Sequence, residues 1–542
     1  MVTHADRVTA SEALFVLALT IKSLPYSWAD TATPLHRLMF PDSKVAKDFS
    51  CSRKKVSYVV SDGLGPYFKG LVHDELNRPG VFYSISVDET PLPEQRCQQF
   101  DVLVHYFSDA EKAVVVEHLQ SFRLGRAMAN ILLKCVNEAT QNIPRAGFFS
   151  FFSDGPNLIK CLKKKLIQEN GPLMEIGECL LHKVHNAFSC ALDSFGSEVE
   201  TVVSDVYYFF KTSSAQTAQL KEKQAVLGLP ETVFLRHVDC RWLSIVPAVE
   251  RLVEQFSALK SILDAQTPVR AAGSVRARLN RNLNDKTLYA KALFVKNAGY
   301  LVVGFLTLFQ KSEPLLHVLY DEMVVMLKKI LGRFLRPQVF MLKQGHELAS
   351  IDVESSQNWK ESIVVGADTE EAMNSWSASE KAEFRLGARS FYIACSKYLL
   401  TRLPLQNLTL QYLRCLQPNT HSQESSAESF RYLAKCAPQV IQPSQVSSLF
   451  DEVTLLSSEV LNVGPDVPLD KYWHNIFIIK SAQGERKYPL LTKLVKALLS
   501  LPHGNADIER GFGQNRRVLN DRSNLSLASV NGIRHIMSFA KR

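Results

Sequence analysis

The stretch FYSISVDETP, residues 82–91, has the pattern of a buried strand that leads into two acidic residues. Phe82 to Val87 combine aromatic, β-branched and small side chains, which is typical of a strand buried in a core. Asp88 and Glu89 follow at once. Because a buried carboxylate without a partner costs several kcal/mol, a core strand that ends in two acids predicts something nearby that compensates their charge.

Further strand-like and helical runs follow this stretch closely. The strand-like runs are FDVLVHYF (100–107), AVVVEHL (113–119) and GFFSFF (147–152). Apolar residues at helical spacing predict helices over 125–140 and 156–170. The predicted order is therefore strand, strand, strand, helix, strand, helix, which is typical of a mixed sheet with flanking helices.

The fourth predicted strand also ends in an acid, because Asp154 follows Phe152 after a single serine. If the first and fourth strands are parallel neighbours, Asp88 and Asp154 emerge at the same edge of the sheet. Ligand and catalytic sites favour the carboxyl ends of parallel strands. The two aspartates are therefore the first candidates for a functional site.

The remainder of the chain reads mainly as helices. Residues 1–75 are expected to be helical, with a break near 40–44, and strand signals are scarce between 245 and 485. Amphipathic patterns predict helices over 184–211 and 241–266, and polar composition predicts a loop over 266–287. The apolar run at 13–21 is too short to span a bilayer, so no membrane association is expected.

Length and composition set broad limits. A chain of 542 residues corresponds to about two to four domains. The apolar content of 46% and charged content of 22% are those of a globular protein. The net charge of +9 is compatible with a nucleic-acid partner. Ten scattered cysteines without a CxxC pair indicate reduced thiols and an intracellular protein.

Several of these stretches resemble the hAT family of DNA transposases and their domesticated relatives. SISVDET and FSDGPNLIK are similar to the surroundings of the first two catalytic aspartates of that family. QFDVLVHYF is similar to the strand that follows the first. CLLHKVHNA (179–187) and CRWLS (240–244) resemble its CxxH and Arg-Trp motifs. Residues 488–526 resemble its carboxy-terminal segment, which is named for dimerisation.

The resemblance implies a fold of the α/β plus α class. An RNase H-like mixed sheet with flanking helices would be interrupted by a large all-α insertion domain. The implied domains are a helical region at 1–75, the first part of the RNase H-like domain at 76–240, the insertion at 241–485 and a completing dimerisation segment at 486–542.

The resemblance also implies a catalytic and metal-binding triad of Asp88, Asp154 and Glu509. Three carboxylates at one sheet edge can hold two divalent cations about 3.5–4 Å apart. Hard oxygen ligands suit Mg²⁺ or Mn²⁺. The implied activity is metal-dependent DNA cleavage and strand transfer. Taken alone, Asp88 is better explained as a solvated acid at a strand end and Asp154 as an ordinary Asp-Gly turn; only the ordered set with Glu509 favours a site.

The remaining candidate residues would contact DNA. The resemblance assigns this role to His182, Arg241 and Trp242, the tryptophan by stacking on a base. Basic helix faces add Lys163, Lys164, Arg516 and Arg517. The alternatives are a histidine and a tryptophan of the core and two solvated helix faces.

The sequence also departs from the family pattern. In HGNADIERGFG (503–513) the small residues that usually flank the third acid are changed, which fits a domesticated copy as well as an active element. Residues 1–75 contain a single cysteine, so a BED-type zinc finger is not expected there. Cys179–His182 and His237–Cys240 have ligand-like spacing, but no structural zinc is expected.

Three hypotheses stay open on these observations. The chain is an active nuclease, or a catalytically silent, domesticated protein that dimerises and acts in chromatin or transcription, or a helical scaffold without a nucleic-acid role. For the first two we expect a nuclear location, weak and non-specific DNA binding, and a homo-oligomer. The apolar stripe of Leu490, Leu494, Val495, Leu498 and Leu499 either forms the oligomer surface or packs inside the same chain, and the pattern favours neither.

Overall fold

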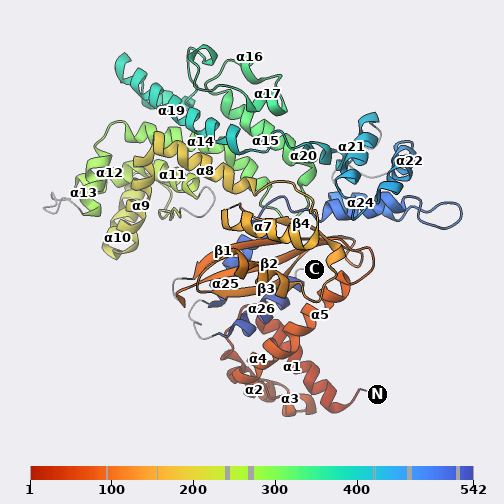
Figure 1. The fold of residues 1–542 in the computed structure, drawn as a ribbon. Helices are drawn as coiled ribbons and strands as arrows, with labels where there is room; N and C mark the ends of the chain where they lie inside the picture. Colours follow the sequence, from red (N-terminus) through yellow and green to blue (C-terminus); the bar gives the residue numbers. More distant parts are fainter. Residues whose placement is uncertain are drawn as a thin grey trace. The chain divides into compact units, whose positions relative to one another are not determined.

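The computed structural model describes residues 2–92, 95–155, 157–238, 244–265, 274–418, 420, 423–459, 467–519 and 525–540 (Figure 1). The chain forms two compact units. The first consists of Met1–Cys179, Gln310–Leu319 and Leu408–Arg542, and the second of Leu180–Phe309 and Tyr320–Asn407. A helical segment does interrupt the sheet-bearing unit, although the predicted borders at 75, 240 and 485 are not those of the two units.

The first unit contains a mixed sheet that has four strands in the described part of the chain. The strands are β1 (Tyr83–Leu92), β2 (Cys97–Ser108), β3 (Ala113–Leu124) and β4 (Phe148–Phe152). Their order is β3-β2-β1-β4. β2 is antiparallel to both β1 and β3, whereas β4 is parallel to β1. The predicted strands and the parallel pairing of the first and fourth are thereby confirmed.

One face of the sheet is apolar. Successive side chains of a strand point to opposite faces, and Tyr83, Ile85 and Val87 of β1 join the main core cluster. α6 (Ala129–Ala139) and α7 (Asn157–Asn170) pack on this face through residues such as Leu132 and Leu162. Both helices were predicted from their apolar spacing.

The other face of the sheet is polar but equally buried. Ser84, Ser86 and Asp88 of β1 lie on it, and Asp88 is paired across the strands with Asp101. This face is covered by helices from the end of the chain, α24 (Pro489–Leu499), α25 (Ala506–Leu519) and α26 (Leu527–Phe539). Figure 1 shows these carboxy-terminal helices, in blue, against the strands.

The amino-terminal helices share a core with α26. They are α1 (His4–Ile21), α2 (Trp28–Met39), α3 (Lys44–Asp48), α4 (Arg53–Tyr58), a π-helical turn (Val59–Leu64) and α5 (Gly65–Leu76). Val16, Phe49 and Val56 pack with Ile533 and Ile536 of α26. The expected break near 40–44 is present between α2 and α3, and the two ends of the chain form a single small core.

The apolar stripe of α24 packs inside the chain. Leu494, Val495, Leu498 and Leu499 are buried, and α24 contacts β2, α22 (Val446–Ser457) and α23 (Leu469–Phe477). Since these four side chains are buried within the chain, they are not available to form a dimer interface. A homo-oligomer stays a prediction, but it needs another surface.

The regular elements of the second unit, among the residues that the structure describes, are helices, joined by loops. Its helices include α8 (Leu180–Ser194), α9 (Ser197–Lys211), α11 (Ile245–Glu254), α12 (Phe256–Asp264), α13 (Val275–Leu283), α14 (Leu288–Leu308) and α19 (Ala378–Arg402). The single helix predicted over 184–211 is two helices, and so is that over 241–266 as far as it is described. The loop predicted over 266–287 contains α13.

By length and composition alone, α14 could cross a membrane, and half of its most apolar window is buried within the unit. Phe294 of this helix packs edge-on against Phe195, Phe384 and Phe391. Aromatic contacts of this kind are typical of a core helix, so the length of α14 is no indication of a membrane span.

Candidate active site

Asp88 lies on the polar face of β1, near the carboxyl end of the strand. Its side chain is 6% exposed. Oδ1 accepts a hydrogen bond of 2.8 Å from the main-chain N–H of Glu89. Oδ2 is buried and has no hydrogen-bond partner among the described residues. A buried carboxylate oxygen without a donor is costly, so this atom identifies a position where a ligand would be stabilising.

Asp154 follows the end of β4, the strand parallel to β1. The register pairs Ser86 with Phe152, which brings the ends of the two strands together. Asp154 is half-buried. Burial raises the pKa of its carboxyl, while hydrogen bonds from the main-chain N–H groups of Asp154 and Gly155 act in the opposite direction.

Glu509 lies in the first turn of α25. Its neighbours Ile508 and Phe512 pack on Leu103 of β2, which fixes this helix on the polar face of the sheet. The Arg510 guanidinium donates to Ser312 Oγ at 2.8 Å and to the carbonyl of Gln310. The helix start is therefore held both by the sheet and by the short segment Gln310–Leu319.

The charges of these three carboxyls act on one another. Burial raises the pKa of Asp88 well above its ordinary value, and the charges of Asp154 and Glu509 raise it further. Burial also raises the pKa of Glu509, Arg516 lowers it, and Asp154 raises it. Like charges interact in this way only at short range. We refer to Asp88, Asp154 and Glu509 as the acid cluster.

A buried ion pair lies on the strand next to Asp88, where Asp101 is the cross-strand partner of Asp88. Arg534 Nη1 of α26 donates to Asp101 Oδ2 at 3.0 Å, and the side chains are 4% and 0% exposed. Asp101 also accepts hydrogen bonds from Gln99 at 2.7 Å and Ser121 at 2.6 Å. Its charges are therefore satisfied, unlike those of Asp88 on the neighbouring strand.

Arg534 reaches Asp101 by passing under α25. A Cβ on Gly511 of α25 would lie 2.4 Å from Arg534 Nη2, so glycine at this position leaves room for the guanidinium. Sequence analysis missed Arg534. The available signal was a lone arginine within an apolar run, GIRHIM (532–537).

The donor set of the acid cluster fits a hard divalent cation, because carboxylate oxygens are the ligands that Mg²⁺ and Mn²⁺ prefer. The unpartnered Oδ2 of Asp88 provides one such oxygen. Within the described residues, no three His, Cys, Asp or Glu side chains stand ready to ligate one ion. Cation binding at this cluster therefore requires the carboxylates to turn toward one another.

The candidate DNA-binding residues lie in several places. Lys164, Arg516 and Arg517 are exposed. Lys163 Nζ is instead 2.6 Å from Glu175 Oε1 and 19% exposed, so a phosphate would have to compete with this ion pair. Arg516 lies near enough to Glu509 to lower its pKa.

Of the other three predicted residues, the structure describes only His182. His182 lies on α8 of the second unit, where burial lowers its pKa to about 4. Arg241 and Trp242 lie outside the described residues. The roles predicted for these residues in DNA binding stay predictions.

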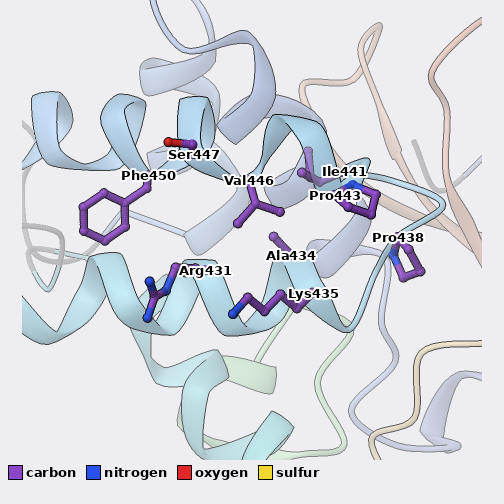
Figure 2. A pocket seen from close by; sticks show the side chains of 9 residues that line it. All are labelled: Arg431, Ala434, Lys435, Pro438, Ile441, Pro443, Val446, Ser447 and Phe450. Carbon is purple, nitrogen blue, oxygen red and sulfur yellow. The ribbon is translucent and has the colours of Figure 1, made fainter.

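The first unit also contains a cavity whose lining residues do not include the acid cluster. This cavity of about 460 Å³ opens between α21 (Glu424–Lys435) and α22. Figure 2 shows Arg431 and Lys435 of α21 facing Val446 and Phe450 of α22. Since none of the described residues that line this cavity is an acid, the cavity offers no carboxylate to a metal ion.

Neither a model of a protein family nor a curated protein sequence matches this chain.

Proposed function

We propose that this protein is a metal-dependent DNA nuclease and strand transferase of the hAT transposase type, built on an RNase H-like core. The proposal is supported by two observations: Asp88 and Asp154 lie at the ends of the paired parallel strands β1 and β4, and Asp88 has a buried oxygen without a partner among the described residues. The charges of Asp154 and Glu509 both act on Asp88. The β3-β2-β1-β4 order with parallel β1 and β4 supports the RNase H-like assignment.

In this proposal the acid cluster holds two divalent cations, Mg²⁺ or Mn²⁺. Bound there, the cations would activate an attacking hydroxyl and stabilise the leaving oxygen of a phosphodiester. Asp88 is the fixed member, since it is buried and its Oδ1 is held by a main-chain N–H. Asp154 and Glu509 are half-buried, and they approach Asp88 from a strand end and from a helix start.

DNA would be held mainly through its phosphates. The exposed Lys164, Arg516 and Arg517 can neutralise phosphate charge without reading bases. We therefore expect weak binding, roughly 10⁻⁴–10⁻⁶ M at physiological salt, that weakens as salt rises. Such a protein would act in the nucleus, and a homo-oligomer would bring two acid clusters to one DNA.

A second candidate function is a catalytically silent, domesticated protein that binds DNA in chromatin or transcription. The altered surroundings of Glu509 favour it. In particular, Asn505 is fully buried, and neither atom of its side-chain amide has a hydrogen-bond partner among the described residues. Such a site has departed from an optimised helix start.

The test is DNA nicking by the full chain with Mn²⁺, together with DNA binding by fluorescence anisotropy. We expect D88N and E509Q to lose nicking while they keep DNA binding. The control D42N changes an exposed aspartate in the turn between α2 and α3 and should keep both properties. Binding without nicking by the unmodified chain would support the silent alternative, and absence of binding would support a scaffold.

A further inference from the structure

A further carboxylate, Glu178, lies beside Asp154. It belongs to residues 174–179, which run along the outer side of β4. Met174 forms a parallel bridge with Ser150. The main-chain N–H of Met174 donates to Phe149 O at 2.9 Å, and that of Cys179 donates to Ser153 O at 3.0 Å. This segment therefore delivers Glu178 to the same sheet edge at which β4 delivers Asp154.

The turn after β4 is shaped to accept Glu178. Gly155 has φ of +95° and follows Asp154 directly. A Cβ on Gly155 would lie 2.4 Å from Glu178 Cδ and 2.7 Å from Oε2. The carboxylate of Glu178 thus lies against the main chain of this glycine, in space that any side chain would fill. Its charge contributes to the raised pKa of Asp154.

A lysine holds Glu178 in its present position. Lys160 Nζ of α7 is 3.0 Å from Glu178 Oε1, and the two side chains are 47% and 31% exposed. An exposed ion pair of this kind contributes little, about 0–1 kcal/mol. Loss of the ion pair with Lys160 would therefore cost little.

Acidic residues gathered together do not by themselves make a cation site. Here the second observation is Asp88, which is nine-tenths buried and whose Oδ2 has no partner among the described residues. This oxygen lies in the field of Asp154 and Glu509. A cation bound to this oxygen would also be stabilised by Asp154, and Glu178 lies beside Asp154.

We infer that Glu178 is a fourth carboxylate of the acid cluster. In the present structure it is paired with Lys160, and it turns toward a divalent cation when one binds at Asp154. The inference rests on the proposed function, since it concerns the same cation site. Release from Glu178 would also free Lys160, on the exposed side of α7, for a DNA phosphate.

The test measures Mn²⁺ binding to the full chain by isothermal titration calorimetry, without DNA and without turnover. We expect E178Q to weaken Mn²⁺ binding by about tenfold, as for other residues that support metal ligands. K160M should have the opposite sign and tighten binding severalfold, because it removes the competitor for Glu178. A purely structural role of the pair would predict no tighter binding for either variant.

Matched controls come from the same two elements. Glu175 and Lys163 form a similar ion pair, with 2.6 Å between Oε1 and Nζ, one turn away from the site. E175Q and K163M should therefore leave Mn²⁺ binding within twofold of the unmodified chain. In the E178Q background, K160M should lose most of its effect, because coupled residues are not additive.

The outcomes separate this inference from the proposed function. If D88N abolishes Mn²⁺ binding while E178Q and K160M bind like the unmodified chain, the cation site stands and the role of Glu178 is overturned. If the unmodified chain binds no Mn²⁺ at millimolar concentration, the proposed function and this inference fall together. Should E178Q not fold, tightening by K160M alone decides in favour of the inference, and its absence decides against it.

Discussion

Asp88 keeps its proton at pH values where an aspartate in the unfolded chain has lost it. Burial and the charges of Asp154 and Glu509 are the causes of its raised pKa. The folded protein therefore binds this proton more tightly than the unfolded chain does. By linkage, the free energy of unfolding then falls as pH rises from the unfolded pKa, near 3.8, through the higher folded pKa.

We expect this pH dependence to be weaker in D88N. Asparagine carries no proton in either state, so the contribution of Asp88 is removed, whereas Asp154 and Glu509, whose pKa values are also raised, still contribute. Thermal unfolding between pH 5 and pH 8 measures the difference, with D42N as the control. If the unfolding temperatures of D88N and the unmodified chain changed equally with pH, the pKa of Asp88 would be the same in the folded and unfolded states.

Divalent cations should act in the same pH range. Protons and cations compete for the carboxylates, so Mg²⁺ should raise the unfolding temperature more at pH 8 than at pH 5. The linkage contribution of a ligand at a hundred times its dissociation constant is about 2.7 kcal/mol. D88N should show almost none of this stabilisation.

Sequence could predict some residues of the site but not others. Asp88 and Asp154 stand out because each ends an apolar strand, and the strand pattern is local. Glu509 could be found only through the resemblance of its surroundings, since helix periodicity does not distinguish it from Asp507. Arg534 showed only the weak signal of a lone arginine in an apolar run, and Glu178 showed none, because their partners lie far away in sequence or across a turn.

At the scale of elements, α25 and α26 approach closely over the sheet at Gly511. Displacing the tip of a free arginine would cost little, but Arg534 is buried and bonded to Asp101. We expect G511A to push the guanidinium off Asp101 and to destabilise the protein by up to about 3–5 kcal/mol, the cost of breaking a buried pair.

The matched control for this prediction is G513A, two residues later in the same helix. No heavy atom lies within 4 Å of a Cβ built on Gly513. Alanine there should be neutral or stabilising by about 0.5–1 kcal/mol, from helix propensity alone. Urea unfolding of both variants measures the contrast. Similar free energies of unfolding for the two would mean that Arg534 relaxes without loss.

Element types were more predictable than element partners. β1, β2, β3 and β4 were found because their composition is strongly strand-like, and α6 and α7 because their apolar faces are regular. The stripe of α24 has an equally regular face, yet its pattern could not say whether another chain or β2 covers it. In the described structure β2 and α22 do, which is a property of the tertiary fold.

At the scale of the whole molecule, the two chain ends depend on each other. Ile536 of α26 is fully buried in the core of the amino-terminal helices. We expect I536A to leave a cavity that costs about 2–5 kcal/mol and to make residues 1–75 easier to digest. Ile478 is 58% exposed, so I478A should change neither property.

Limited proteolysis followed by mass spectrometry tests this prediction. Faster cleavage within 1–75 in I536A, but not in I478A, is the expected result. Cleavage that is accelerated only near the substituted residue would show that the amino-terminal helices are stable without α26.

The order of the sheet and its covering helices has a consequence for biosynthesis. The four described strands end by residue 152, whereas the helices that cover the polar face of the sheet begin only at residue 489. In a nascent chain on the ribosome, the polar face of the sheet therefore stays uncovered until translation is nearly finished, and Asp88 and Asp101 are exposed to water. Products of premature termination would keep that face uncovered and so be substrates for chaperones and proteases. An unfinished chain would hold Asp88 and Asp154 without Glu509, so the acid cluster is completed only near the end of translation.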